Sequence, residues 1–234
     1  MAKKNRNSKT AVTAPKKNMF AIGVTTAAVV VLGVIITLVV WLNNQSSGPA
    51  RLPDAASSSS VIESDGGIRV KDGADTVGVY LDPMCPACRA FEQSYTPLIM
   101  QQEDLGLVFH PIAILDRLSQ GTLYSTRSAA SIYAVAVASP ESVSDYVKSL
   151  YANQPAEGST GLPNDQLISL AAQSGATITE ADIEQWQKYV SSAVRSVPIG
   201  PGASGVVTPT VTLNDEFVNR SGNPNTDIAG WVSK

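Results

Sequence analysis

The sequence predicts an α/β domain that carries an inserted block of helices and is preceded by one transmembrane helix. Three observations lead to this prediction. An apolar run without charged residues lies near the N-terminus, at 19–42. Further on, a β-rich run leads directly into a Cys-x-x-Cys motif at 85–88, which helical periodicity follows. After a long stretch of helical periodicity, strand character returns only near the C-terminus, at 206–213.

The N-terminal region is predicted to be a cytoplasmic tail followed by a signal anchor. Residues 1–18 contain no acidic residue and six basic ones, namely Lys3, Lys4, Arg6, Lys9, Lys16 and Lys17. The apolar run at 19–42 would form a helix about 36 Å long, against a hydrocarbon core of about 30 Å. By the positive-inside rule the chain crosses the cell membrane once, with the tail in the cytoplasm and the rest outside. A cleaved secretory signal is the alternative, although its apolar region usually spans only about 7–15 residues.

The remaining chain divides into a linker and one domain. Residues 43–64 have the composition of a flexible linker, because Ser, Asn, Ala and Pro dominate it. Residues 65–234 are enough for one domain with its own core. The whole chain has a formal net charge of −3 and the tail carries +6, so the exported part has 11 basic and 20 acidic residues, or −9. A surface this acidic argues against nucleic acid as a partner.

The first half of the domain is predicted as strand, helix, strand. The run 76–81, "TVGVYL", is short, apolar and rich in β-branched residues, which favours a strand. Apolar residues then recur at helical intervals from Cys85 to Glu103, and Pro97 should kink this helix or end its first part. The run 105–115, "LGLVFHPIAIL", is predicted as a second strand.

A helical insertion at about 118–197 separates this half from the last strands. Ser139 and Pro140 indicate the start of one helix. Thr179, three residues before Asp182, is typical of an N-terminal cap for another. Strand character returns in "VVTPTVTL" at 206–213 and more weakly in "EFVNR" at 216–220, and a short helix from Thr226 to Val232 closes the chain.

The spacing of the two cysteines has a chemical explanation. In a helix that begins at Cys85, free N–H groups of the first turn converge on the sulfur, and the helix dipole favours a thiolate there. Pro86 suits the first helical position, and Ala87 completes the motif. Cys88, one turn on, is close enough to form a disulfide. We expect Cys85 to be the exposed attacking sulfur and Cys88 the shielded resolving one. The redox-active group is then the Cys85–Cys88 disulfide, and we expect no bound cofactor.

Two other uses of the cysteines are open, a metal site and a structural bridge. A structural zinc site needs four ligands, whereas the chain supplies two thiols and one histidine, His110, so we expect no metal. A purely structural bridge is possible, but closing so short a loop stabilises a fold little. Export would place the thiols in an oxidising compartment, where disulfides persist. Redox chemistry is therefore the favoured interpretation.

The order of elements is that of a thioredoxin-like fold with an inserted helical subdomain, and two motifs carry a family resemblance. "YLDPMCPACRAFE" after a strand and "GVVTPTVTLNDEFV" near the end resemble the DsbA/DsbG-like thiol–disulfide oxidoreductases, above all the membrane-anchored actinobacterial forms. The resemblance covers about 68–233. It implies that the Thr208–Pro209 bond is cis and lies beside the cysteines, where Thr208 would offer strand-like hydrogen bonds to an extended client. Without the resemblance, Pro209 would merely begin an edge strand with a trans bond.

The resemblance also implies partners and leaves the direction of electron flow open. We expect clients that are exported proteins with free thiols, reoxidation by a quinone-linked membrane oxidant of the DsbB or VKOR type, and a monomer that acts as an oxidase. A disulfide isomerase or reductase is the alternative, as is a non-catalytic binding module.

The chain also departs from the family pattern near the cysteines, because many relatives place a buried acid where this chain has Val79. Asp82 lies nearer the motif, in the strand-to-helix turn, where it is expected to be solvated. Glu92, one helical turn after Cys88, could approach that thiol, but an exposed helix face is the favoured interpretation.

Overall fold

The computed structural model describes residues 51–232, which belong to one compact unit. The predicted cytoplasmic tail, the predicted span at 19–42 and the first part of the predicted linker lie outside the described residues. Within 51–232, every helix is too short or too polar to cross a membrane.

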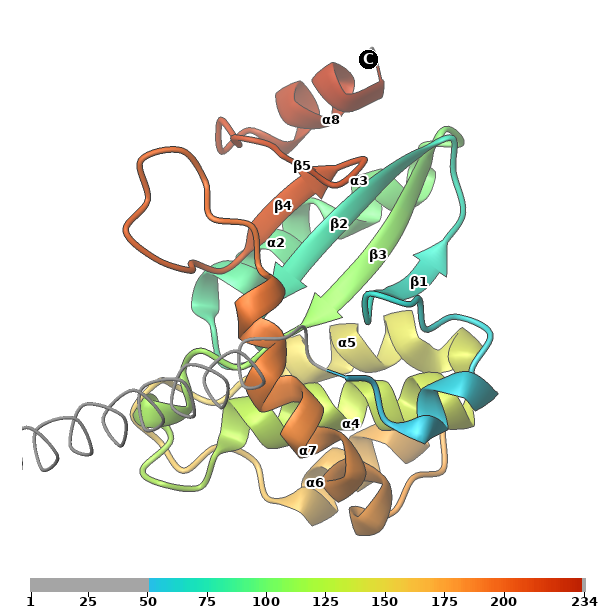
Figure 1. The fold of residues 1–234 in the computed structure, drawn as a ribbon, viewed down its shortest axis with the longest axis vertical. Helices are drawn as coiled ribbons and strands as arrows, with labels where there is room; N and C mark the ends of the chain where they lie inside the picture. The colour runs from blue at the N-terminus through green and yellow to red at the C-terminus, as the bar shows by residue number, and fades with distance from the viewer. Residues whose placement is uncertain (1–50, 233–234) are drawn as a thin grey trace, which may run out of the picture. The chain divides into compact units, whose positions relative to one another are not determined.

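A mixed five-stranded sheet forms the centre of the fold (Figure 1). Its strand order is β1-β3-β2-β4-β5. The bounds are β1 Ile68–Lys71, β2 Asp75–Leu81, β3 Leu105–Pro111, β4 Thr210–Leu213 and β5 Glu216–Phe217. Only β2 and β3 run parallel, and the other neighbouring pairs are antiparallel. The two parallel strands need a crossover connection, which the helices after the cysteine motif supply.

Two short helices make that crossover, α2 (Pro86–Ser94) and α3 (Thr96–Gln101). The chain breaks at Tyr95, two residues before Pro97, so the predicted interruption of the helix is confirmed. A proline in the first turn lacks only an N–H that would have no partner there. The last helix, α8 (Pro224–Val232), contacts α3 and ends the described chain.

The predicted helical insertion lies between β3 and β4. It contains α4 (Tyr124–Ala138), α5 (Val143–Ala152), α6 (Asn164–Gln173) and α7 (Glu180–Ala193), with short 3-10 turns at Asp116–Leu118, Pro140–Ser142 and Val194–Ser196. Helix α4 is buried around most of its circumference because α5, α6 and α7 all pack on it. The predicted cap of α7 is confirmed, since the Thr179 side chain and Asp182 form a reciprocal capping box.

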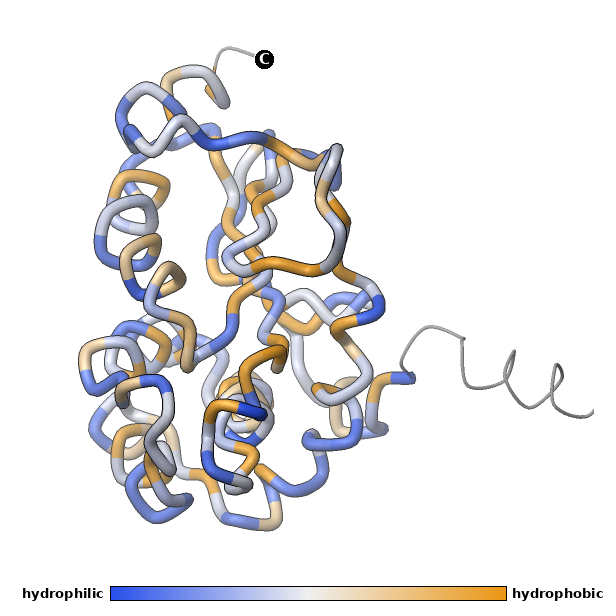
Figure 2. Tube along the Cα trace, turned by 90° about the vertical axis from the view of Figure 1, so that its left-hand side faces the viewer, coloured by the Kyte–Doolittle hydropathy of each residue, from blue (hydrophilic) through white to orange (hydrophobic). Residues whose placement is uncertain are grey.

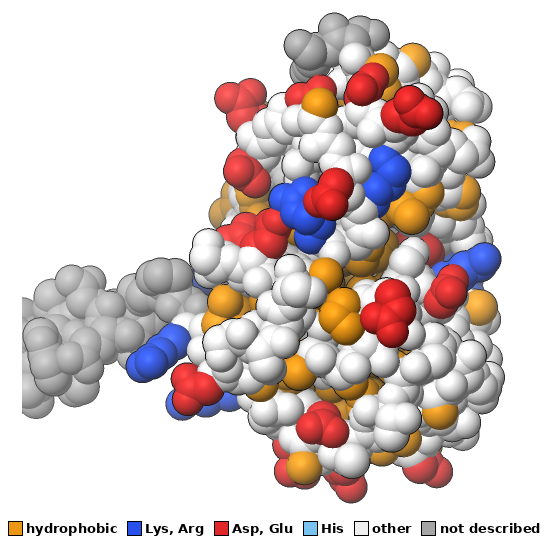
Figure 3. Space-filling view, turned by 90° about the vertical axis from the view of Figure 1, so that its right-hand side faces the viewer, with side chains coloured by type: hydrophobic (Ala, Val, Ile, Leu, Met, Phe, Trp, Pro, Cys, Tyr) orange, Lys and Arg blue, Asp and Glu red, His pale blue; other side chains and the backbone are white. Residues whose placement is uncertain are grey.

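The other insertion helices are amphipathic. Figure 2 shows apolar and polar segments alternating along the helical turns. Helix α5 is an example, because its buried residues recur at helical intervals, at Val143, Tyr146, Val147, Leu150 and Tyr151. The described charges of both signs are interspersed on the face that Figure 3 shows.

Two features differ from the sequence-based expectation. Residues 51–64, assigned to the linker, pack on the domain: a 3-10 turn at Asp54–Ser58 buries Ala56, and the Ser59 hydroxyl donates to the carbonyl of Ala136 at 2.7 Å. The small side chains that suggested a linker are the ones that allow this close packing. Strand β1 was not predicted either, because only four residues form it and its pairing with β3 is irregular.

Candidate active site

The two cysteines lie at the start of helix α2. Cys85 is the N-cap residue with extended backbone angles, Pro86 occupies the first turn, and the Cys85 carbonyl accepts hydrogen bonds from the N–H groups of Cys88 and Arg89. Pro86 and Ala87 are exposed, and both thiols are free. The side chain of Cys85 is only 7% exposed, so it is more covered than predicted, yet it remains more accessible than Cys88 at 2%.

The two thiols have opposite acidities. A hydrogen bond from the Cys88 thiol is the largest influence on Cys85 and lowers its pKa to about 6, with help from Thr208 and from the N–H groups of Cys88 and Ala87. Burial works against this shift. Burial and the neighbouring Cys85 sulfur raise the pKa of Cys88 well above its usual value. At neutral pH the pair therefore holds one thiolate, on Cys85, and one thiol, on Cys88.

The segment before strand β4 completes the site. The Thr208–Pro209 peptide bond is cis. In its protonated form, the Cys85 thiol donates to the Thr208 carbonyl oxygen at 3.4 Å, although 123 residues separate the two in sequence. Of the six residues that the sequence singled out, four are thus brought together, namely Cys85, Cys88, Thr208 and Pro209, while Pro86 and Ala87 form the exposed start of the helix between the thiols.

Asp82 is buried rather than solvated, which corrects the expectation from its place in a turn. Its side chain is 0% exposed. One carboxylate oxygen accepts from the Met84 N–H at 2.8 Å and from the Ser125 hydroxyl at 2.7 Å, and the other accepts from the N–H groups of Ile114 and Leu115 at 2.7 and 2.9 Å. Burial raises the pKa of this carboxyl, and the four donors oppose that rise. Asp82 therefore ties the cysteine turn to the loop after β3 and to helix α4.

The helical insertion holds the same turn from the side of α5. The Tyr151 hydroxyl donates to the Asp82 carbonyl at 3.2 Å, and the Gln154 amide donates to the carbonyls of Pro83 and Cys85, each at 2.9 Å. Sequence reasoning missed both residues, because their approach to the turn depends on how the insertion packs and leaves no local motif.

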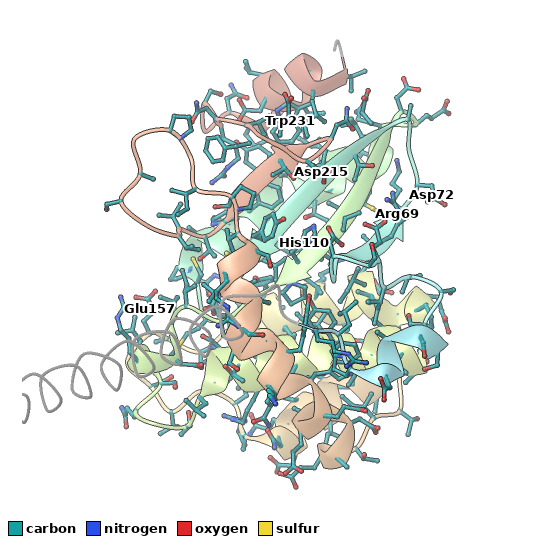
Figure 4. All side chains as sticks on the ribbon, viewed as in Figure 1. Arg69, Asp72, His110, Glu157, Asp215 and Trp231 are labelled. Carbon is teal, nitrogen blue, oxygen red and sulfur yellow. The ribbon has the colours of Figure 1, made fainter. Side chains whose placement is uncertain are left out.

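Arg220 packs on two aromatic rings and contacts the cis-proline segment. The Arg220 guanidinium lies 5.4 Å from the Phe91 ring and 5.5 Å from the Tyr95 ring, and it donates to the Pro209 carbonyl at 3.4 Å. Tyr95 in turn donates to Asp227 at 2.7 Å and stacks on Trp231, which is labelled in Figure 4. These contacts join α2, the chain before β4 and α8 on one side of the site.

Glu92 is also buried, contrary to the expectation of an exposed helix face. Glu92 is 7% exposed, and its carboxylate accepts a hydrogen bond from the Thr96 hydroxyl at 2.7 Å. Burial raises its pKa to about 7, against the lowering influence of Thr96 and Lys148. The helix wheel of α2 could have suggested burial, because Glu92 lies one turn after the buried Cys88.

The contacts of His110 are with residues other than the two cysteines. Its ring stacks on Tyr80 with 4.2 Å between the centroids, and the residue lies on strand β3 (Figure 4). It lines a cavity of about 170 Å³ with Tyr80, Asp65 and Tyr189. In the part of the chain that the structure describes, no group of three or more His, Cys, Asp or Glu side chains is placed to hold a metal ion.

Comparisons with known proteins agree with this geometry. A family model described as thioredoxin matches residues 70–228. The serine/threonine-protein kinase PknE of Mycobacterium tuberculosis is 30% identical over 158 residues, which are 62% of this chain and 27% of the kinase. The chain therefore spans only about a quarter of the length of this curated relative.

Solved structures with the same fold include two from Mycobacterium tuberculosis. Reduced DsbA is 26% identical with a TM-score of 0.59, covering 71% of this chain and 91% of DsbA. The reduced disulfide bond oxidoreductase DsbG is 26% identical with a TM-score of 0.61, covering 77% of this chain and 91% of DsbG. Oxidised BdbD from Bacillus subtilis, at 18% identity and a TM-score of 0.51 over 79% of this chain and 96% of BdbD, shares the fold.

Proposed function

Because the chain belongs to the thioredoxin family, and within it to the DsbA- and DsbG-like proteins, we propose that it is a thiol–disulfide oxidoreductase whose active site is the motif Cys85-Pro86-Ala87-Cys88. One observation carries the proposal. The Cys85 sulfur, with its pKa lowered to about 6, lies between the Cys88 thiol and the Thr208 carbonyl. A stabilised thiolate beside a second thiol is the arrangement that disulfide exchange requires.

The proposed reaction transfers the enzyme disulfide to a client. A client thiolate attacks the Cys85 sulfur of the Cys85–Cys88 disulfide, and Cys88 leaves with the electron pair of the broken bond and takes up a proton. A second client thiolate then attacks the client sulfur of the mixed disulfide, and Cys85 leaves as a thiolate. The client loses two electrons and forms one disulfide, while the enzyme pair gains the two electrons.

The acidity of Cys85 favours the oxidase direction. A thiolate that is stable at neutral pH is a good leaving group, and it stabilises the reduced enzyme, which makes the enzyme disulfide more oxidising. A pKa of about 6 lies between the values near 7 for thioredoxin and near 3.5 for DsbA. The enzyme should therefore oxidise reduced clients, though less strongly than the most acidic family members. An isomerase or reductase on the same site is the competing function.

The surface beside the thiols suits an unfolded client. The loop that precedes Thr208 exposes two large apolar side chains, Ile199 at 58% and Val207 at 55%. Extended client backbone could add hydrogen bonds of the strand type at Thr208. Val207 directly precedes Thr208, which contacts Cys85, so this exposed apolar group would favour clients whose cysteines are not yet folded away.

The proposed location and partners rest on the N-terminal sequence. The six basic residues of 1–18 and the apolar run at 19–42 support a single-pass anchor in the cell membrane, with the catalytic domain outside. There the site would meet exported proteins with free thiols. A quinone-linked oxidant within the membrane would return Cys85 and Cys88 to the disulfide, and the enzyme would work as a monomer.

Disulfide exchange with glutathione tests the proposal. The purified full-length chain should equilibrate its two cysteines with mixtures of reduced and oxidised glutathione, and Cys85→Ser should abolish the exchange. Failure of the wild-type chain to exchange would favour the binding module instead. Given exchange, rapid oxidation of a reduced model protein with little repair of a mispaired one supports the oxidase, and the opposite ranking supports the isomerase.

A further inference from the structure

His110 is buried without a hydrogen-bond partner for its side chain. It is 8% exposed, and among the described residues neither ring nitrogen has a donor or an acceptor within reach. The ring fits because a Cβ atom at Gly67 would lie only 2.8 Å from its Cε1 atom. Burial lowers the pKa of His110, against the raising influence of Asp65 and Asp215, so the ring is uncharged at neutral pH and keeps one nitrogen as an acceptor. A buried polar group of this kind calls for an explanation.

The imidazole forms part of the wall of a cavity on one face of the sheet. His110 of β3 and Tyr80 of β2 are paired in register, and their rings stack. Because side chains alternate between the two faces of a strand, both point away from the face of the fully buried Val79 and Phe109. The cavity has a volume of about 170 Å³, and its wall also includes residues from the segment before β1, from α4 and from α7. This space is enough for about five water molecules or one small organic group.

The cavity wall offers several polar atoms that have no partner among the described residues. One Asp65 oxygen accepts from the Gly67 N–H at 2.9 Å, and the other oxygen is free to accept. The hydroxyl groups of Tyr80, Ser64 and Ser196 are likewise free. An ammonium group carries three donors and no acceptor, so it complements a wall made of carboxylate, imidazole and hydroxyl acceptors.

The electrostatic field in the cavity also favours a cation. Burial raises the pKa of Tyr80 to about 12, and the negative charges of Asp65 and Asp215 add to that rise. A second hollow of about 630 Å³ shares Asp65 with the cavity and adds the carboxylates of Glu63 and Asp215. Its basic side chain, Arg69, already donates to Glu63 at 2.7 Å (Figure 4). Within the described part of the chain, Asp65 and Asp215 form no ion pair, so their charge is left for a ligand to balance.

Other ligand classes suit this wall less well. An anion would meet the carboxylate of Asp65 without a free cation to offset it. A structural zinc ion needs four ligands, whereas the described residues contain no group of three or more His, Cys, Asp or Glu side chains placed to hold a metal. Three tyrosines, Tyr80, Tyr133 and Tyr189, supply much of the wall, and aromatic rings attract organic cations.

We propose that this cavity binds an organic ammonium group, with Asp65, His110 and Tyr80 as its hydrogen-bond acceptors. The group is the head of a small amine or the end of a lysine side chain of another protein, and the two share the same chemistry. Because neither cysteine lines the cavity, the inference does not depend on the proposed function.

His110 is the single histidine of the sequence, which makes the test specific. The full-length chain is labelled with carbon-13 at the Cε1 position of histidine, so that His110 gives one NMR signal. It is titrated with n-butylammonium chloride at neutral pH and constant ionic strength. We expect a saturable shift of this signal with a dissociation constant of about 1 mM. The uncharged 1-butanol, which is similar in size, should give no saturable shift.

Three variants test the wall. Asp65→Asn removes the charge but keeps an oxygen that can accept from the Gly67 N–H, so it should weaken butylammonium binding at least about fivefold. Asp104→Asn makes the same change at an exposed position outside the cavity and should bind as the wild type does. Tyr80→Phe keeps the ring that stacks on His110 but loses the hydroxyl, so it should weaken binding about threefold.

The peptide acetyl-Gly-Lys-Gly-amide distinguishes the two sources of the ammonium group. If it binds at least as tightly as butylammonium, the ligand is a lysine side chain, and if butylammonium alone binds, the ligand is a small amine. The proposal is overturned if neither probe gives a saturable shift, if 1-butanol gives the same shift, or if Asp65→Asn binds as tightly as the wild type. Should Asp65→Asn fail to fold, Tyr80→Phe provides the decision, and undiminished binding in that variant overturns the proposal.

Discussion

The Ser125 hydroxyl donates a 2.7 Å hydrogen bond to the Asp82 carboxylate, and this bond joins helix α4 of the insertion to the turn that carries the cysteines. Three backbone N–H groups converge on the same carboxylate. The active-site turn is therefore held by residues from distant parts of the chain. Its geometry depends on the insertion being folded.

Removing the Asp82 carboxylate should destabilise the protein strongly. In Asp82→Ala, three buried donors and the partly buried Ile114 N–H lose their acceptor, and each unsatisfied buried group costs about 1–3 kcal/mol. We expect a loss of more than about 3 kcal/mol in the free energy of unfolding, measured by urea denaturation of the reduced chain.

Ser125→Ala is the matched comparison for this prediction. It removes one donor and leaves the carboxylate with three, so it should cost only about 1 kcal/mol. Equal losses in the two variants would contradict the view that the carboxylate, rather than the single bond to α4, organises the turn.

The acidity of Cys85 gives a prediction about pH. Because the pKa of Cys85 is lowered to about 6, the reduced chain should form one thiolate with a midpoint near pH 6 as the pH is raised. The ultraviolet absorbance of the thiolate measures this titration. A lowered pKa stabilises the folded reduced state fully above the ordinary thiol pKa of 9.0, and this stabilisation declines as the pH falls until it is lost at about pH 6. Cys85→Ser should lack the transition, and a wild-type midpoint near the value of a free thiol would contradict the thiolate assignment.

Trapping distinguishes the roles of the two thiols. In Cys88→Ser, the exposed start of α2 keeps the attacking sulfur, but the buried thiol that could reverse a mixed disulfide is gone. Client adducts should therefore accumulate at Cys85 in cells and appear as larger species on non-reducing gels. Cys85→Ser should accumulate none, although Cys88 is still present. Adducts in Cys85→Ser would show that Cys88 is the accessible nucleophile.

The features that sequence predicted are those with local causes. Pro97 ends α2 because of its own ring, Thr179 and Asp182 cap α7 three residues apart, and Cys85 begins a helix that Pro86 presets. These effects act within one turn of the chain, so a pattern of residue types is enough to predict them.

The features that sequence did not predict are set by tertiary packing. A turn aspartate such as Asp82 is usually solvated, and its burial follows from donors that lie 32, 33 and 43 residues away. Glu92 is buried because α5 packs across α2. The four residues of β1 form a strand because β3 offers them a partner. The contact between Cys85 and Thr208 was anticipated only through family resemblance, because 123 residues separate them.

Arg220 should stabilise the cis-proline segment through packing as well as charge. Its guanidinium lies over the Phe91 and Tyr95 rings and donates to the Pro209 carbonyl. A cation over aromatic faces contributes about 0.5–1 kcal/mol at partly exposed sites, and a hydrogen bond from a charged donor adds about 1 kcal/mol or more. Arg220→Met keeps much of the aliphatic volume but loses both interactions, so it should lower the free energy of unfolding by about 1–2 kcal/mol in urea denaturation.

The choice of replacement tests the geometry at Arg220. Lysine keeps the charge over the rings, but it lacks the planar guanidinium, which can stack on a ring and donate a hydrogen bond in its own plane at the same time. Arg220→Lys should therefore be more stable than Arg220→Met but less stable than the wild type. Arg195→Met changes an exposed arginine just after α7 and should stay within about 0.5 kcal/mol of wild type. If Arg220→Met is as stable as Arg195→Met, the stack on α2 contributes nothing measurable. If Arg220→Lys restores full stability, charge alone accounts for the effect, and the contact of the guanidinium with Pro209 plays no part in holding the segment against Cys85.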